Sequence, residues 1–149
     1  MVGTTLSEQL NNHIQTMHDQ GILDHHFDHV KKLQNEGNPQ FVVRVISMFF
    51  NDAETGIAQI TSFLNSDDVD FAKTINYVHQ LKGCSSSIGG QRMALACSEL
   101  RNACDDRDKQ RCLEIFERVK QEYSTLQECF NTISQMERTI ANETGGRQP

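Results

Sequence analysis

Apolar residues recur every three or four positions along almost the whole chain, and the strict alternation typical of a half-buried strand is nearly absent. This spacing gathers apolar side chains on one face of a helix. The 149 residues include only 2 prolines, so few points force a helix to break. The pattern therefore predicts an all-α protein.

The pattern places two short helices between residues 4 and 34 and four longer ones from about residue 39. Asp24 is placed to cap the second helix. In the break at 35–39 (NEGNP), we expect Asn38 to cap the long third helix and Pro39 to open it. Ser66, Asp67 and Asp68 are expected to form a turn and an N-cap for the fourth helix, and Gly89–Gly90 to separate the fourth helix from the fifth.

Four amphipathic helices joined by short connections favour an antiparallel four-helix bundle, with the two additional N-terminal helices covering one end or side of it. We expect residues 1–143 to form a single domain. The last six residues, 144–149 (TGGRQP), are expected to be a disordered tail.

Charge and composition exclude several classes of function. The formal net charge is −6 and the basic residues are scattered, so we expect no direct nucleic-acid binding. No apolar run approaches the ~20 residues of a membrane span, so no membrane insertion is expected. The 5 cysteines form no C-x-x-C pair and read as free thiols in a reducing compartment, packed as small hydrophobes.

The segment 78–90 (VHQLKGCSSSIGG) differs from the rest of this bundle sequence. On a helical wheel, Phe71, Ile75 and Val78 cluster on the face expected to point into the bundle. His79 falls about 80° from Phe71, on the flank of that stripe. The imidazole should therefore be partly exposed.

The neighbours of His79 suit a phosphoryl acceptor. Gly83, four residues on, leaves room beside the ring at a cost of about 0.5–1 kcal/mol in helix stability relative to alanine. Lys82 offers an ammonium that could neutralise a phosphoryl group. An unprotonated ring nitrogen is a nucleophile. By itself, however, H-x-x-K-G is a short pattern, and a histidine beside an apolar stripe is more often a boundary residue.

The segment from His79 to Gly90 (HQLKGCSSSIGG) closely resembles the signature H-Q-L-K-G-S-S-S-S-I-G-A of plant histidine-containing phosphotransfer (HPt) proteins. The stretch LDHHFDHVKKLQNEGNPQFV, followed by FF, is similar to the family's second helix, loop and start of the third helix. Arg101–Asn102 and the long last helix also fit, so the resemblance covers nearly the whole chain.

The resemblance implies that His79 is phosphorylated, on Nε2. It would accept the phosphoryl group from the receiver domain of a hybrid sensor histidine kinase and pass it to a response-regulator aspartate in a cytokinin-type two-component phosphorelay. Lys82, Gly83 and, less directly, Gln91 would lie beside the phosphate. The exposed flank with Ala72, Gln80 and Ser86 would dock the receiver, together with parts of the second and early third helices.

The chain has no Gly-rich phosphate loop and no paired acidic cluster typical of a kinase metal site. We therefore expect a monomeric carrier, not an ATP-dependent autokinase. It should need no cofactor of its own, with Mg²⁺ supplied in the partner receiver domain. The resemblance also implies a location in cytoplasm and nucleus.

Two positions depart from the signature: Cys84 stands in place of serine and Gly90 in place of alanine. Cys84 lies about 140° from His79 on the wheel, so neither change should remove the chemistry. Family members that lack the histidine inhibit the relay, and the presence of His79 argues against that role.

Other classes of function stay open at this point. The leading alternative is a non-phosphorylated helical adaptor, and a redox sensor would require an exposed, acidic cysteine. His25 and His29, four residues apart on one helix face, could ligate a metal together with an aspartate. Two histidines without a fixed third ligand are more typical of a solvated face, so no metal site is predicted.

Overall fold

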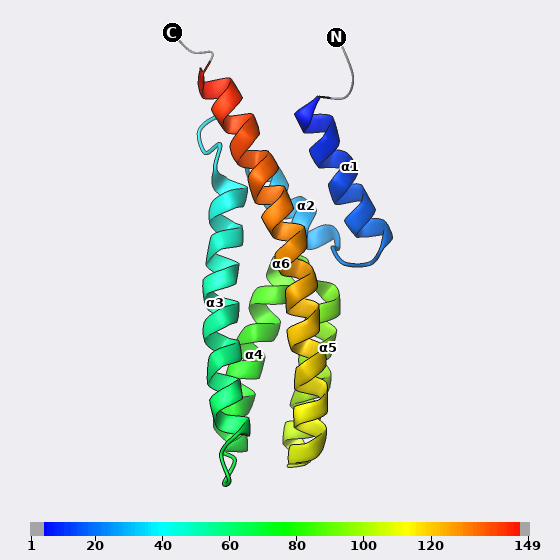
Figure 1. The fold of residues 1–149 in the computed structure, drawn as a ribbon, viewed down its shortest axis with the longest axis vertical. Helices are drawn as coiled ribbons and strands as arrows, with labels where there is room; N and C mark the ends of the chain where they lie inside the picture. Colours follow the sequence, from blue (N-terminus) through cyan, green and yellow to red (C-terminus); the bar gives the residue numbers. More distant parts are fainter. Residues whose placement is uncertain (1–4, 147–149) are drawn as a thin grey trace.

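The computed structural model describes residues 5–146, and within this range the chain forms helices and no strand. The helices are α1 (Leu6–Asp19), α2 (His25–Lys32), α3 (Phe41–Leu64), α4 (Phe71–Ser87), α5 (Gln91–Asp105) and α6 (Lys109–Gly146) (Figure 1). The predicted all-α class is confirmed.

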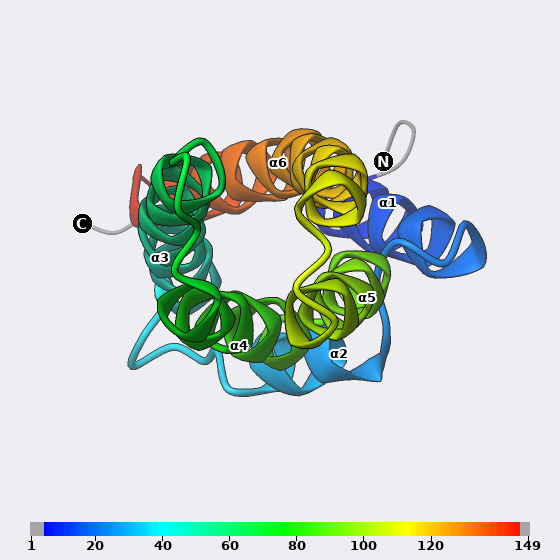
Figure 2. The same cartoon turned by 90° about the horizontal axis from the view of Figure 1, so that it is seen from below.

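Helices α3, α4, α5 and α6 surround a common core, with each helix antiparallel to the one before it (Figure 2). The core consists of apolar side chains that all four helices contribute. Its largest fully buried members from the bundle include Ile46, Ile60, Leu64, Leu81, Met93, Leu100, Phe130 and Ile133. The antiparallel four-helix bundle is therefore as predicted.

The two N-terminal helices cover the end of the bundle that α4 and α5 do not reach. α3 has 24 residues and α6 has 38, whereas α4 has 17 and α5 has 15, so α3 and α6 extend past the shorter pair (Figure 1). α1 packs along α6, and α2 contacts α3 and α4. Phe27 of α2 is completely buried and stacks on Phe130 of α6, with ring centroids 5.7 Å apart. Burial of such a ring contributes roughly 1.5–3 kcal/mol.

The start of α2 is as predicted, but the start of α3 is not. Asp24 caps α2, and its side chain accepts a hydrogen bond from the backbone N–H of His26 at 2.9 Å. α3 begins at Phe41, two residues after Pro39, and Asn38 does not cap it. Instead, the Asn38 side chain closes the preceding loop by accepting from the Asn35 N–H.

The caps of α4 and the end of α6 also differ from the prediction. Asp70, and not the turn at 66–68, caps α4 by accepting from the Lys73 N–H at 3.0 Å. An N-cap must stand directly before the first helical residue, and α4 begins at Phe71. α6 continues to Gly146, so the expected tail is helical over 144–146, and the rest of it lies outside the described residues.

A buried ion pair joins the N-terminal segment to α6. Glu137 is 3% exposed, and its carboxylate accepts hydrogen bonds from Lys31 Nζ at 2.8 Å and from Gln34 Nε2 at 3.2 Å. The Gln34 side-chain oxygen in turn accepts from the Val42 N–H at 3.0 Å and so satisfies a free donor in the first turn of α3. Three segments therefore meet at one carboxylate.

Replacement of Lys31 by methionine should leave the Glu137 carboxylate buried without its cation. Loss of one partner from a buried pair costs about 3–5 kcal/mol, and because Lys31 is partly exposed we expect about 2–3 kcal/mol of the free energy of unfolding to be lost. Urea denaturation measures this. Lys32→Met, at an exposed neighbouring position, is the matched control and should change stability by under about 0.5 kcal/mol. Equal effects of the two variants would contradict this role of Glu137.

Candidate functional site

His79 lies in the middle of α4 on its solvent face. The buried face of α4 is formed by Thr74, Val78, Leu81 and Ser85, whereas Phe71 and Ile75 are only partly buried. The buried face thus overlaps the stripe expected from the sequence, since Val78 is buried and Phe71 and Ile75 pack against the core. It also includes two small polar residues, Thr74 and Ser85. Their hydroxyls are satisfied by the helix backbone, at Asp70 O and Leu81 O respectively. His79 is therefore fully on the exposed side of α4.

The two residues expected beside His79 are also exposed. Within the described residues, neither the His79 ring nor the Lys82 ammonium makes a hydrogen bond or an ion pair. A methyl group added at Gly83 would meet nothing within 4 Å. Gly83 is therefore not required by packing inside the protein, and it leaves the surface next to the imidazole open.

One groove runs along the side of α4 that faces α2 and α5. It has a volume of about 310 Å³ and is lined by Asp24, His26, Lys82, Ser86, Gln91, Ala94, Leu95 and Ser98. Leu95 is 64% exposed, so this groove has an apolar wall next to a cation. Leu95 was not among the residues expected at the site, although its position two residues after the buried Met93 directs it away from the core.

A second groove, of about 340 Å³, lies between α3 and α4 on the other side of the exposed face. Its lining includes Asp52, Tyr77, Gln80 and Cys84. The three residues expected to dock a receiver are thus separated. Ser86 lines the first groove, Gln80 lines the second, and Ala72 is exposed about two helical turns before His79.

Gln91 lies at the start of α5 and lines the same groove as Lys82. Its side-chain amide donates to the backbone carbonyl of Gly21 at 2.9 Å. The structure therefore brings Gln91 near Lys82, as expected, but gives its amide a structural partner in the α1–α2 loop.

The corner between α4 and α5 contains two glycines, of which only Gly89 has a positive φ. Gly89 has φ +91°, and a side chain there would come within 2.7 Å of the Phe27 backbone nitrogen. The corner thus touches the first turn of α2 directly. At Gly90, where the family signature has alanine, an added methyl would meet Leu126 Cδ1 at 2.6 Å. The side chain of Leu126 thus fills the space that the alanine methyl would occupy.

The cysteines are the residues on which a redox role would depend. All five cysteines are free; Cys84 is half-buried, and the other four are buried. Burial raises the pKa of Cys97 and Cys129 to about 12, and that of Cys84 to about 11, with Asp52 adding to the shift at Cys84. Because the thiolate is the reactive form, these cysteines are poor redox sensors.

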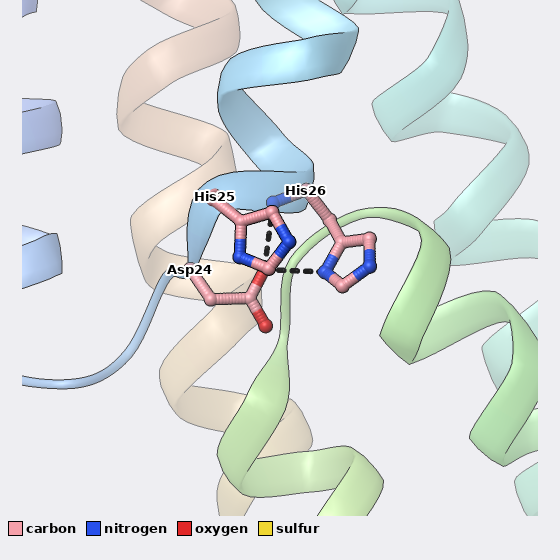
Figure 3. Close-up of side chains that lie close together, drawn as sticks. All are labelled: Asp24, His25 and His26. Atoms are coloured by element: carbon pink, nitrogen blue, oxygen red, sulfur yellow. Dashed lines mark hydrogen bonds and ion pairs between the residues drawn. The ribbon is translucent and has the colours of Figure 1, made fainter.

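A separate cluster lies at the start of α2, where Asp24, His25 and His26 come together (Figure 3). The pair expected from the sequence as possible ligands was His25 with His29, whose ring centroids are 5.9 Å apart. His26 was not expected to join them, because residues adjacent in a helix usually point about 100° apart. The N-cap geometry of Asp24 brings the three together.

Known proteins are similar to this chain in both sequence and fold. The family model of the Hpt domain matches residues 44–129. Histidine-containing phosphotransfer protein 5 of Arabidopsis thaliana is 35% identical over 100% of this chain and 95% of its own. The chain belongs to the Hpt family. A histidine-containing phosphotransfer protein from maize has a solved structure with TM-score 0.86 and 36% identity, covering 91% of this chain and 99% of that chain.

Overall similarity does not separate Hpt proteins from pseudo-Hpt proteins. A pseudo histidine-containing phosphotransfer protein of rice is 34% identical over 82% of this chain and 80% of its own. The site residues have to make that distinction, and this chain has His79.

Membership of the Hpt family gives the protein its general function. It is a phosphoryl carrier in a phosphorelay, and it interacts with receiver domains and response regulators. In the part of the chain that the structure describes, no helix combines the length and apolarity needed to cross a membrane.

Proposed function

We propose that His79 is the residue of this Hpt protein that carries the phosphoryl group. The observation that carries the proposal is an exposed, unpaired imidazole in the middle of a rigid helix, next to a glycine that no internal contact requires. The other histidines lie outside α4.

The transfer needs only a nucleophile from this chain. The lone pair of His79 Nε2 attacks the phosphorus of an aspartyl phosphate in the receiver domain. The new N–P bond forms as the O–P bond breaks, and the bonding electrons leave with the aspartate as a carboxylate. The ring proton stays on Nδ1. Transfer to the response regulator is the same step in reverse.

Lys82 supplies charge beside the phosphoryl group. Its ammonium is one helical turn from His79, exposed and without an ion-pair partner among the described residues, so it is free to approach a phosphate oxygen. In-line positioning and most of the charge neutralisation would come from the receiver domain with its Mg²⁺. The chain thus needs no cofactor of its own and has no ATP-dependent autokinase activity.

The receiver domain docks over the exposed face of α4. We assign its main contact to the groove between α4, α5 and the start of α2, because exposed Leu95 offers it an apolar surface close to Lys82. Ser86 and Gln91 line this groove, Ala72 extends the same face, and Gln80 would contact the receiver from the α3 side.

The relay that best fits this chain is cytokinin-type signalling from a hybrid sensor histidine kinase to response regulators. The similarity to plant Hpt proteins over nearly the whole chain supports this assignment. A carrier between a membrane-bound sensor and nuclear regulators would work as a monomer in cytoplasm and nucleus. A non-phosphorylated adaptor would have no use for the open surface at Gly83.

Replacement of His79 by glutamine should abolish labelling from a phosphorylated receiver domain, because the amide side chain has no comparable nucleophile. The side chain is exposed, so helicity measured by circular dichroism should not change. The wild-type protein with labelled ATP alone should stay unlabelled. Receiver-dependent labelling of the His79→Gln variant would overturn the assignment.

Replacement of Gly83 by glutamine should separate transfer from folding. An exposed glycine inside a helix costs about 0.5–1 kcal/mol relative to better helix formers, so Gly83→Gln should be at least as stable as wild type. The added side chain would occupy the approach to His79, and we expect the transfer rate to fall by about tenfold or more, equivalent to about 1.4 kcal/mol in the barrier.

Ser124→Gln, at an exposed position on α6, is the matched control, since α6 lies across the bundle from α4 (Figure 2). It should transfer at the wild-type rate. A folded Gly83→Gln protein with an unchanged transfer rate, measured by stopped-flow or quenched-flow kinetics, would contradict the role given to Gly83.

A further inference from the structure

The start of α2 gathers three potential metal ligands in one place. Asp24, His25 and His26 each offer one ligand atom, and these atoms all lie within 4.8 Å of one another (Figure 3). Among the side chains that the structure describes, this is the one such group of three. It lies outside α4, and the phosphoryl chemistry of His79 does not use it.

The carboxylate of this group is already held in position. Asp24 Oδ1 accepts hydrogen bonds from the His26 N–H at 2.9 Å and from the His26 ring at Nδ1, at 3.0 Å. The Asp24 backbone N–H donates to the carbonyl of Gly89 at 3.0 Å, which fixes the residue against the α4–α5 corner. The side chain is only 17% exposed. This is the third ligand, fixed by the fold, that a pair of histidines alone would lack.

The two imidazoles stand over this carboxylate. The ring centroids of His25 and His26 are 4.2 Å apart, and both side chains are exposed, so both rings can turn without disturbing the core. Zinc with ligands at about 2.0–2.1 Å in a tetrahedron requires ligand atoms about 3.3 Å apart. The ligand atoms here lie within 4.8 Å of one another, so the exposed rings have to turn toward the carboxylate, and the His26 ring has to exchange its hydrogen bond with Asp24 for the ion. His29, one turn further along α2, stands next to His25.

We propose that Asp24, His25 and His26 form a binding site for Zn²⁺, with water as the fourth ligand. Two imidazole nitrogens favour zinc over Mg²⁺ or Ca²⁺, which prefer oxygen ligands. The ionised carboxylate offsets part of the ion's charge, and both imidazoles bind as neutral rings.

The position of this site links it to the surface used for docking. Asp24 and His26 also line the groove that contains Lys82. A bound ion would therefore add positive charge at the rim of that groove. Binding itself depends only on the three ligands and not on phosphorylation.

Titration calorimetry of the untagged full chain with zinc chloride, in buffer free of chelators, tests the site. We expect one Zn²⁺ per chain, removable with EDTA. Loss of outer-shell partners usually weakens metal sites by 10–100-fold, so loss of a ligand in His25→Ala or His26→Ala should weaken binding by at least about tenfold. Asp24→Asn should also weaken binding while it still caps α2, because asparagine is an equally good N-cap.

His79→Gln is the matched control, because it removes an exposed histidine outside the cluster. It should bind zinc as the wild type does. The proposal is overturned if the wild type binds no zinc, if the His25→Ala and His26→Ala variants keep wild-type affinity, or if His79→Gln is the variant that loses it.

Discussion

The rotation of α4 about its own axis decides which groups this protein presents to solvent. Val78, Leu81 and Ser85 are buried against the rest of the bundle. This packing is stable because Ser85, completely buried, has its hydroxyl bonded to the Leu81 carbonyl at 2.6 Å. With that face fixed, His79 and Gly83 must face outward. The proposed nucleophile, His79, is thus placed by burial of the opposite side of the same helix.

Gly83 lowers the helical stability of α4, and the packing of the fold does not explain why a glycine stands there. Gly83 lies in the middle of an exposed helical face, where most residues would be more stable, and nothing in the structure fills the space beside it. Gly89 is different, because its positive φ and its contact with the Phe27 backbone require a glycine. One glycine is therefore required by the architecture, and the role that we propose for the other is access to His79.

The N-terminal helices do more than cover the end of the bundle. The first turn of α2 touches the α4–α5 corner through Asp24 and Gly89. At its other end, Lys31 and Gln34 bind the buried carboxylate of Glu137. These contacts at both ends of α2 fix His26 beside the groove that contains Lys82.

Much of this arrangement could be predicted from the sequence, because apolar spacing determines helices and short connections determine their antiparallel packing. Exposure of His79 followed from the same spacing. The burial of Thr74 and Ser85 in α4 was not predicted, because both residues are polar and a sequence does not reveal that backbone carbonyls satisfy their hydroxyls. The Asp24–His25–His26 cluster was not predicted for a similar reason, since it depends on the N-cap conformation of Asp24.

The central claim is that one exposed imidazole carries the phosphoryl group, and site mapping of the phosphorylated protein tests it most directly. The chain would be labelled by a phosphorylated receiver domain, digested at neutral or alkaline pH to keep the N–P bond, and sequenced by mass spectrometry. We expect one phosphoryl group, on the peptide that contains His79. A phosphoryl group on another histidine, or on none, would contradict it.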